Sequence, residues 1–312
     1  MRGNDDILFI AHVSPDGDTL GSCLALYHMA LQMGNRAQVA CEEPVPSAYR
    51  FLPGADVVTP PEDARQAAAV MCVDCADTAR AGRCQALVNA AERTFCIDHH
   101  GTNSGYADGN YIEPAAATGE LAYKLLRELR LTLTADIATC LFAAISSDTG
   151  NFSYANTTPE SFRIAADLAE TSIDIAVINR FLFRSFPYNK VMLRGRAITN
   201  MRLYCRGQLG MSILTQRDMR ECSATSGDAE GIVDLIRDID TVQIAVLLRE
   251  SSDSRIRVSM RAKTAVNLGE LAAALGGGGH LHAAGCTLDM PIPEAAERLR
   301  AVMEAALVST ES

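Results

Sequence analysis

Short apolar runs alternate with helical patterns over the first 185 residues, and this alternation limits the fold more than any other feature. The runs are apolar on both faces and span residues 7–13, 36–41, 68–75 and 94–98. Helical patterns lie between them, at 18–34 and 82–91. Strands that are buried on both faces and joined by helices form parallel sheets. We therefore predict an α/β fold with a parallel sheet in this part of the chain.

Mainly helical patterns follow the sheet, and a second α/β unit begins near residue 203. Residues 187–202 start with Pro187 and have few apolar anchors, so we predict a linker that contains a helix. Beyond it, a hairpin turned at Arg206 and Gly207 leads into further strands and helices. We expect two domains, at 1–186 and 203–312, of which the second is the smaller.

The charge balance excludes some partners. The chain has 28 Lys and Arg against 38 Asp and Glu, a net charge of −10, which disfavours a protein that grips long duplex DNA through a basic face. A small anionic substrate held by a few local cations fits this balance.

No segment reaches the roughly 20 consecutive apolar residues of a membrane span, and the first residues lack the layout of a signal peptide. We expect a cytoplasmic protein with no membrane partner.

Ten cysteines are scattered through apolar runs, where thiols usually act as small buried hydrophobes. Cys72 and Cys75 form the one close pair. A single C-x-x-C without a second pair is a weak zinc signal. We therefore predict structural cysteines.

Acidic and imidazole side chains follow the ends of several apolar segments. They are His12, Asp16, Asp18, Asp74, Asp98, His99, His100 and Asp148. The carboxyl ends of parallel strands collect at one sheet edge, where such folds place their sites. Crowded carboxylates repel one another, so a bare cluster binds protons or cations. Oxygen-rich ligands with a few imidazoles favour Mn²⁺ or Mg²⁺, and two such ions about 3.5–4 Å apart can cleave a phosphoester through a shared hydroxide.

Each piece of this set has a structural alternative when it is taken alone. An aspartate after a strand commonly caps a helix or forms a turn, and two adjacent histidines can lie on the surface. However, five of the six histidines fall within these segments or in the glycine-rich stretch near the C-terminus, and only His28 lies elsewhere. This concentration favours a metal site, and we interpret His28 as structural.

The order of these motifs resembles the DHH phosphoesterase superfamily. The sequence has H-x-x-x-D-x-D at 12–18, a strand-end Asp74, D-H-H at 98–100 and S-D-T-G at 147–150. The stretch GGGGHLHAAG at 276–285 resembles the DHH-associated C-terminal domain. The chain is most similar to the stand-alone bacterial nano-RNases, oligoribonucleases that also act as pAp phosphatases. RecJ exonucleases and family II pyrophosphatases share the metal motifs and are more distant.

This resemblance implies a catalytic N-terminal domain, a substrate-binding C-terminal domain and a cleft between them. Two divalent ions are implied, with Mn²⁺ preferred and Mg²⁺ or Co²⁺ as alternatives. Asp74 would bridge them. The implied ligands are His12, Asp16 and Asp74 for one ion and Asp18, Asp74, His99 and Asp148 for the other. His100 would face the substrate, and Asp98 would fix a histidine tautomer, so both are assigned to catalysis.

Candidate substrate contacts lie in the second domain. Arg261 and Lys263 occupy alternating strand positions and so project from one face. The glycines at 277–279 let backbone N–H groups approach an anion, although a bare glycine run also fits a flexible loop. The resemblance adds His280 as a contact. Thr118 and Glu120 lie in a segment that also suits a helix start, and we assign them no role.

The predicted function is metal-dependent hydrolysis of short oligoribonucleotides (nanoRNA) to mononucleotides, and of the 3′-phosphate of pAp, by a hydroxide that bridges two metals. The substrate would be the partner, and a homodimer is allowed. Alternatives are a phosphodiesterase for dinucleotide signals such as pApA or pGpG, a pyrophosphatase, and a non-catalytic nucleotide sensor.

Overall fold

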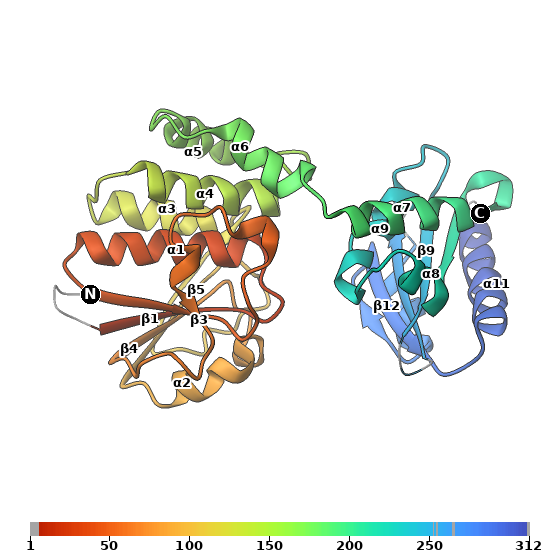
Figure 1. Cartoon of the computed structure of the whole chain (residues 1–312), viewed down its shortest axis with the longest axis horizontal. Helices are drawn as coiled ribbons and strands as arrows, with labels where there is room; N and C mark the ends of the chain where they lie inside the picture. The colour runs from red at the N-terminus through yellow and green to blue at the C-terminus, as the bar shows by residue number, and fades with distance from the viewer. Residues whose placement is uncertain (1–5, 252, 254, 264–265, 311–312) are drawn as a thin grey trace. The chain divides into compact units, whose positions relative to one another are not determined.

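The structure is a computed structural model that describes residues 6–251, 253, 255–263 and 266–310. The chain divides into two compact units, Met1–Ser185 and Phe186–Ser312, which are treated separately below (Figure 1).

The first unit is built on a six-stranded sheet in which every neighbouring pair of strands is parallel. The order is β3-β2-β1-β4-β5-β6. Its strands are β1 (Asp6–Ala11), β2 (Arg36–Ala40), β3 (Val58–Thr59), β4 (Ala69–Val73), β5 (Arg93–Asp98) and β6 (Gly109–Ile112). The central strand β4 is buried along its whole length, as its unbroken apolar sequence predicts. The expected α/β fold with a parallel N-terminal sheet is confirmed.

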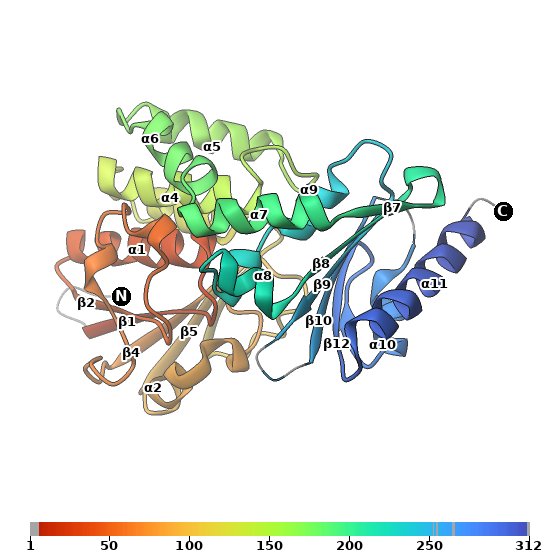
Figure 2. The same ribbon diagram turned by 45° about the vertical axis from the view of Figure 1, so that its right-hand side comes forward.

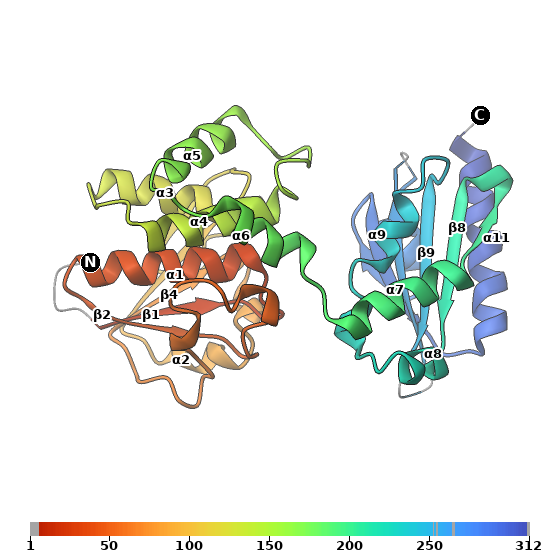
Figure 3. The same ribbon diagram turned by 45° about the horizontal axis from the view of Figure 1, so that its top comes forward.

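Helices cover both faces of this sheet (Figure 3). One face packs against α1 (Gly17–Gln32) and α3 (Thr118–Glu128). Helix α4 (Ala135–Asp148) packs on these two helices, and α5 (Pro159–Ala169) and α6 (Ile175–Asn179) lie beyond it. The other face is covered by a 3₁₀ segment, Thr78–Cys84, and the short α2 (Gln85–Asn89). The helix expected over 82–91 is present but shorter: Gly82, with φ of 54°, breaks the 3₁₀ segment before it, and the α-helix begins at Gln85 and ends at Asn89.

The second unit contains a mixed six-stranded sheet in the order β11-β12-β10-β9-β8-β7 (Figure 2). Only β8 and β9 are parallel, and the other pairs of strands are antiparallel. The strands are β7 (Arg202–Tyr204), β8 (Leu209–Leu214), β9 (Ile244–Glu250), β10 (Ile256–Ala262), β11 (Gly278–Gly279) and β12 (Ala283–Leu288). The turn between β7 and β8 has positive φ at Arg206 and Gly207, where the sequence predicts a hairpin.

Helices pack on both sides of the second sheet. On one side lie α7 (Tyr188–Asn200), α8 (Gln216–Glu221) and α9 (Ile232–Arg237), and on the other α10 (Leu268–Ala274) and α11 (Ile292–Thr310). Helix α7 falls within the segment 187–202 that the sequence marks as a linker. Its Leu193 and Ala197 are buried in the core of the second unit, which fixes α7 there rather than in a free connection.

The ten cysteines all lie within the described residues and are free thiols, and all except Cys205 are buried. Their burial agrees with a packing role. None of the helices in the described parts of the chain has the length and apolarity needed to cross a bilayer.

Helices α1 and α4 approach closely at Gly21, so this glycine tests the packing above the sheet. A Cβ on Gly21 would lie 2.5 Å from the Cys140 carbonyl oxygen. Gly21→Ala should therefore lower the free energy of unfolding by about 1–3 kcal/mol, the usual cost of overpacking. The matched control is Gly195→Ala on α7, which meets nothing within 4 Å and should stabilise by roughly 0.5–1 kcal/mol. Calorimetric unfolding that shifts equally in both variants would contradict this packing.

Candidate metal centre

The predicted ligands meet at the carboxyl edge of the parallel sheet. His12 directly follows β1, Asp74 follows β4, and His99 follows the end of β5. These three strands are neighbours, and the strand order reverses between β1 and β4, which is where open α/β sheets bind their ligands. Residues far apart in the sequence thus reach one place because the strands are parallel.

His12, Asp16 and Asp74 form one group, whose donor atoms lie within 4.8 Å of one another. His12 Nε2 is 3.6 Å from Asp16 Oδ2 and 3.4 Å from Asp74 Oδ2. The other oxygen of Asp16, Oδ1, accepts hydrogen bonds from the backbone N–H groups of Asp18 and Thr19 and so caps α1. Capping and cation binding are therefore compatible roles for Asp16, because each uses a different oxygen.

Asp18, His99 and Asp148 form a second group. His99 Nε2 lies 3.4 Å from Asp148 Oδ2, 3.6 Å from Asp74 Oδ1 and 3.9 Å from Asp18 Oδ2. Asp148 comes from the last residue of α4 and not from a strand. Asp74 lies between the groups, since one of its oxygens faces His12 and the other faces His99.

The first turn of α3 holds two of these carboxylates from behind. The backbone N–H groups of Thr118 and Gly119 donate to Asp18 at 2.7 and 2.9 Å, and the Thr118 hydroxyl donates to Asp74 Oδ1 at 2.8 Å. Helix N-termini favour negative charge. Sequence reasoning missed this role of Thr118, although a Thr-Gly pair at a helix start was the available signal.

Asp98 orients His100. Its Oδ1 lies 2.8 Å from His100 Nδ1, and its Oδ2 accepts a hydrogen bond from Asn103 at 2.7 Å. Asp98 is fully buried, whereas the side chain of His100 is 45% exposed and can reach a ligand. The hydrogen bonds from His100 and Asn103 outweigh burial and lower the pKa of Asp98, and the Asp98 partner raises the pKa of His100.

The pKa shifts show that the site attracts positive charge. Burial, together with repulsion from Asp74, Asp148 and Asp16, raises the pKa of Asp18 well above its usual value. Burial and the carboxylates of Asp74 and Asp16 raise the pKa of Asp148 to about 6. Burial alone would lower the pKa of His12, but Asp16 and Asp74 raise it to about 9. Four carboxylates that converge in this way fit two divalent cations.

Arg80 also lies at the site and was not predicted from the sequence. Its Nη2 is 3.0 Å from His12 Nδ1, and the same Nδ1 is 2.8 Å from the Val13 carbonyl oxygen. When Nδ1 donates to Val13, the lone pair of Nε2 points toward the carboxylates, as a metal ligand requires. Arg80 then supplies a cation beside the site rather than a hydrogen bond to His12.

The predicted substrate contacts lie in the second unit. Arg261 Nε donates to Asp234 Oδ1 at 3.2 Å, and Lys263 Nζ donates to the Ile239 carbonyl oxygen at 2.7 Å. Both side chains thus extend toward α9 and the residues after it. His280 is exposed. Arg261 is already paired, so a phosphate would compete with Asp234 for its guanidinium.

Strand packing, and not only ligand binding, explains why glycine occurs within residues 277–279. A Cβ on Gly277 would lie 2.2 Å from the Gly285 carbonyl oxygen, and one on Gly279 would lie 2.4 Å from the Ala284 Cα. Close pairing with β12 therefore requires glycine at both positions. Gly278 meets nothing within 4 Å and leaves its backbone open on that side.

Comparison with known proteins covers nearly the whole chain. Residues 6–145 match the model of the DHH family, N-terminal domain, and residues 212–309 match that of the DHHA1 domain. The bifunctional oligoribonuclease and PAP phosphatase NrnA of Thermus thermophilus is 33% identical, over 97% of this chain and 91% of that protein. The cyclic-di-AMP phosphodiesterase PdeA of Listeria monocytogenes is 26% identical over 97% of this chain but only 48% of its own length.

A solved structure shows the same fold. The exopolyphosphatase-related protein from Bacteroides fragilis has a TM-score of 0.88 to this chain and 27% sequence identity. The similarity covers 98% of this chain and 92% of that one.

The raised pKa of Asp148 gives a pH-dependent prediction. Its pKa rises from 3.8 to about 6, so the protonated carboxyl stabilises the fold below about pH 4, and this stabilisation is lost as the pH rises through 6. In EDTA at pH 7.5, Asp148→Asn should be more stable than the wild type by about 1–3 kcal/mol, with little difference at pH 4.

Excess Mn²⁺ should reverse that order, because the variant loses a ligand. Urea unfolding at both pH values, with and without Mn²⁺, measures this effect. Asp63→Asn, at an exposed carboxylate, is the control and should change stability by less than about 0.5 kcal/mol in every condition. If Asp148→Asn is destabilising in EDTA at pH 7.5, the carboxylates do not repel one another as described.

Proposed function

Because the chain belongs to the DHH family of phosphoesterases, we propose that it hydrolyses short oligoribonucleotides to mononucleotides and removes the 3′-phosphate of pAp. The observation that carries this proposal is the convergence of His12, Asp16, Asp18, Asp74, His99 and Asp148 at one sheet edge. The 33% identity to an oligoribonuclease and PAP phosphatase along most of both chains favours these substrates over others in the family.

The two ligand groups suggest how the cations are held. In this proposal His12, Asp16 and Asp74 bind one ion, and Asp18, Asp74, His99 and Asp148 bind the other, with Asp74 shared. The oxygen-rich donor set with two imidazoles and no thiolate favours Mn²⁺. When bound, such ions supply an activated water and stabilise negative charge on the phosphoester. Thr118 and the start of α3 keep Asp18 and Asp74 in place for this purpose.

His100 is the proposed group that hydrogen-bonds the phosphate or transfers a proton. With its Nδ1 bonded to Asp98, its Nε2 is the nitrogen left to meet a substrate. The raised pKa of His100 favours the imidazolium, which donates to an anionic oxygen. Asp98 acts through His100 and is a positioning residue.

Substrate capture is proposed for the second unit. Arg261 would bind a phosphate with its planar guanidinium in exchange for Asp234. His280, Lys263 and the backbone at 277–279 would contact the same nucleotide. These assignments rest on the match to the DHHA1 domain.

A phosphodiesterase for dinucleotide signals is the second candidate function. The observation in its favour is the 26% identity to the Listeria cyclic-di-AMP phosphodiesterase along 97% of this chain. A pyrophosphatase is a weaker alternative within the same chemistry. A non-catalytic sensor is disfavoured, because degenerate sensors would lose ligands, and here both ligand groups are complete.

A substrate panel separates these functions. Triadenylate, pAp, pApA, pGpG, cyclic-di-AMP and pyrophosphate should be assayed side by side with Mn²⁺ by product chromatography. We expect turnover of the triadenylate and pAp with higher kcat/KM than of the cyclic compound or pyrophosphate. Turnover of cyclic-di-AMP or pyrophosphate alone would contradict the proposal.

Two substitutions separate chemistry from binding. Loss of a residue that only hydrogen-bonds a metal ligand typically lowers activity by roughly 10–100-fold. Asp74→Asn should lower kcat by more than this, because it changes a proposed ligand itself. Arg261→Ala should raise KM by about 10–100-fold with little change in kcat, because it removes charge-assisted hydrogen bonds to the substrate. Arg298→Ala, at an exposed arginine on α11, is the control and should change neither constant. Near-normal kcat for Asp74→Asn in Mn²⁺ would refute the shared ligand.

A further inference from the structure

A pocket of about 570 Å³ opens at the carboxyl ends of β2 and β3, beside the metal centre. Its volume falls within the roughly 300–1,000 Å³ of small-molecule sites. Strand β2 pairs with β3 at Ala40 and Thr59, so the chain leaves both strands at this point and encloses the space. None of the assigned metal ligands lines it.

Two contacts connect the pocket to the metal centre. Cys41, in the pocket wall, lies with its Sγ 3.7 Å from the carbonyl oxygen of His12. The carboxylate of Glu43, also in the wall, accepts a hydrogen bond from the backbone N–H of Ser14. Ser14 lies between His12 and Asp16 in the sequence, so the wall of the pocket supports the loop that carries two predicted ligands.

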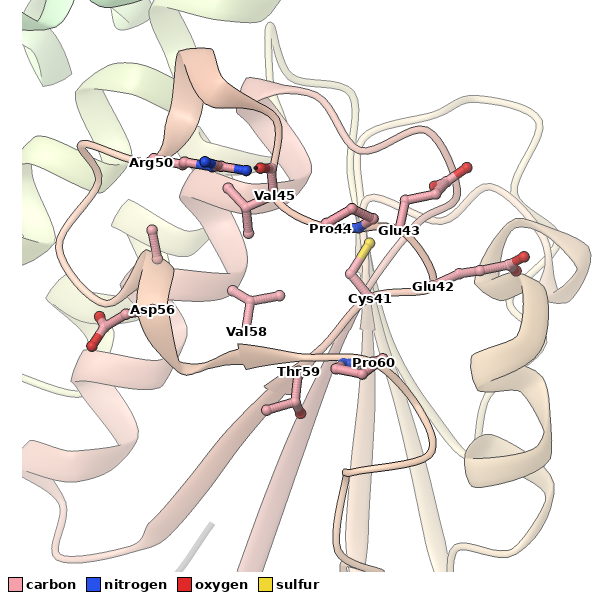
Figure 4. Close-up of a pocket in the computed structure, with 11 residues that line it drawn as sticks. Cys41, Glu42, Glu43, Pro44, Val45, Arg50, Asp56, Val58, Thr59 and Pro60 are labelled. Atoms are coloured by element: carbon pink, nitrogen blue, oxygen red, sulfur yellow. Dashed lines mark hydrogen bonds between the residues drawn. The ribbon is translucent and has the colours of Figure 1, made fainter.

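The walls of the pocket are mainly aliphatic (Figure 4). The side chains of Val45 and Val58 point toward one another across it, and Pro44 and Pro60 lie at the end nearer Cys41. The polar side chains of Arg50 and Asp56 lie at the opposite end. Arg50 Nε donates to the Val45 carbonyl oxygen at 3.2 Å, and the Asp56 carboxylate points away from the valines.

The charges of the pocket exclude other occupants. Glu42, Glu43 and Asp56 outnumber the one cation, Arg50, so a phosphate would be repelled. Glu42 is already bonded to the backbone N–H of Arg83, and Glu43 to Ser14, and in Figure 4 both carboxylates point away from the valines, so they do not form a cation site within it. The aliphatic walls therefore favour an uncharged ligand, and a heterocyclic ring is one that fits this chemistry.

We propose that this pocket binds the nucleobase of the nucleotide whose phosphate lies at the metal centre. This inference rests on the proposed function, because it takes a nucleotide as the substrate. The base lies between Val45 and Val58, with its polar edge toward the guanidinium of Arg50. Open α/β sheets bind their ligands at the switch point, here between β1 and β4, and the pocket begins one strand away, at the end of β2. The pocket thus adds base binding in the catalytic unit itself.

The test compares intact substrates with abasic ones. Wild-type protein is assayed with Mn²⁺ on pApA and on two analogues, each of which lacks one of the two bases. One analogue should lose at least about tenfold in kcat/KM, the factor that corresponds to about 1.4 kcal/mol. If neither analogue differs from pApA, the pocket does not bind a base and the proposal is overturned.

Substitutions that fill the pocket with a large side chain test whether the loss of kcat/KM arises there. Val58→Trp and, independently, Val45→Trp should reduce the ratio of kcat/KM between pApA and the sensitive analogue to about one. Val308→Trp, at a residue of α11 that is 70% exposed, is the control and should keep the wild-type ratio. Thermal unfolding identifies a variant that does not fold. In that case the kcat/KM ratio of the other pocket variant tests the proposal.

A wild-type ratio in both folded pocket variants would overturn the proposal, because the base would then bind elsewhere. A chain without nucleotide phosphoesterase activity gives a different result, namely no turnover of pApA or of either analogue by the wild type.

Discussion

Repulsion among buried carboxylates is the constraint on which this structure depends. Asp18 and Asp74 are almost completely buried, and Asp16 and Asp148 lie beside them. Anions in a low-dielectric site are costly unless cations or donors surround them. The protein supplies donors from the start of α3 and imidazoles from His12 and His99, and the remaining negative charge calls for divalent cations.

The parallel sheet brings these charged residues together with little loss of conformational entropy. Three parallel neighbours, β1, β4 and β5, end at one edge and deliver their residues without long loops. Their apolar sides are buried by helices on both faces, so the stability of the unit comes from the core and not from the site. The adjacent pocket at β2 and β3 uses the same edge, which places a proposed base site next to a proposed phosphate site.

Much of the site could be predicted from the sequence because its residues follow the ends of recognisable apolar strands and helices. The parallel sheet followed from runs that are apolar on both faces, and the order of the motifs predicted that the six proposed ligands lie close together. Thr118 and Arg80 could not be found this way, because their roles depend on how α3 and the 3₁₀ segment pack against the sheet. The pairing of β11 with β12, which requires Gly277 and Gly279, is likewise a tertiary contact that a glycine run alone does not reveal.

Electron paramagnetic resonance of the protein titrated with Mn²⁺ tests the central claim most directly. If the carboxylates converge on two cations that share Asp74, the second equivalent of Mn²⁺ should produce the spectrum of a spin-coupled pair. A spectrum of isolated Mn²⁺ at every ratio, or saturation at one equivalent, would contradict the account.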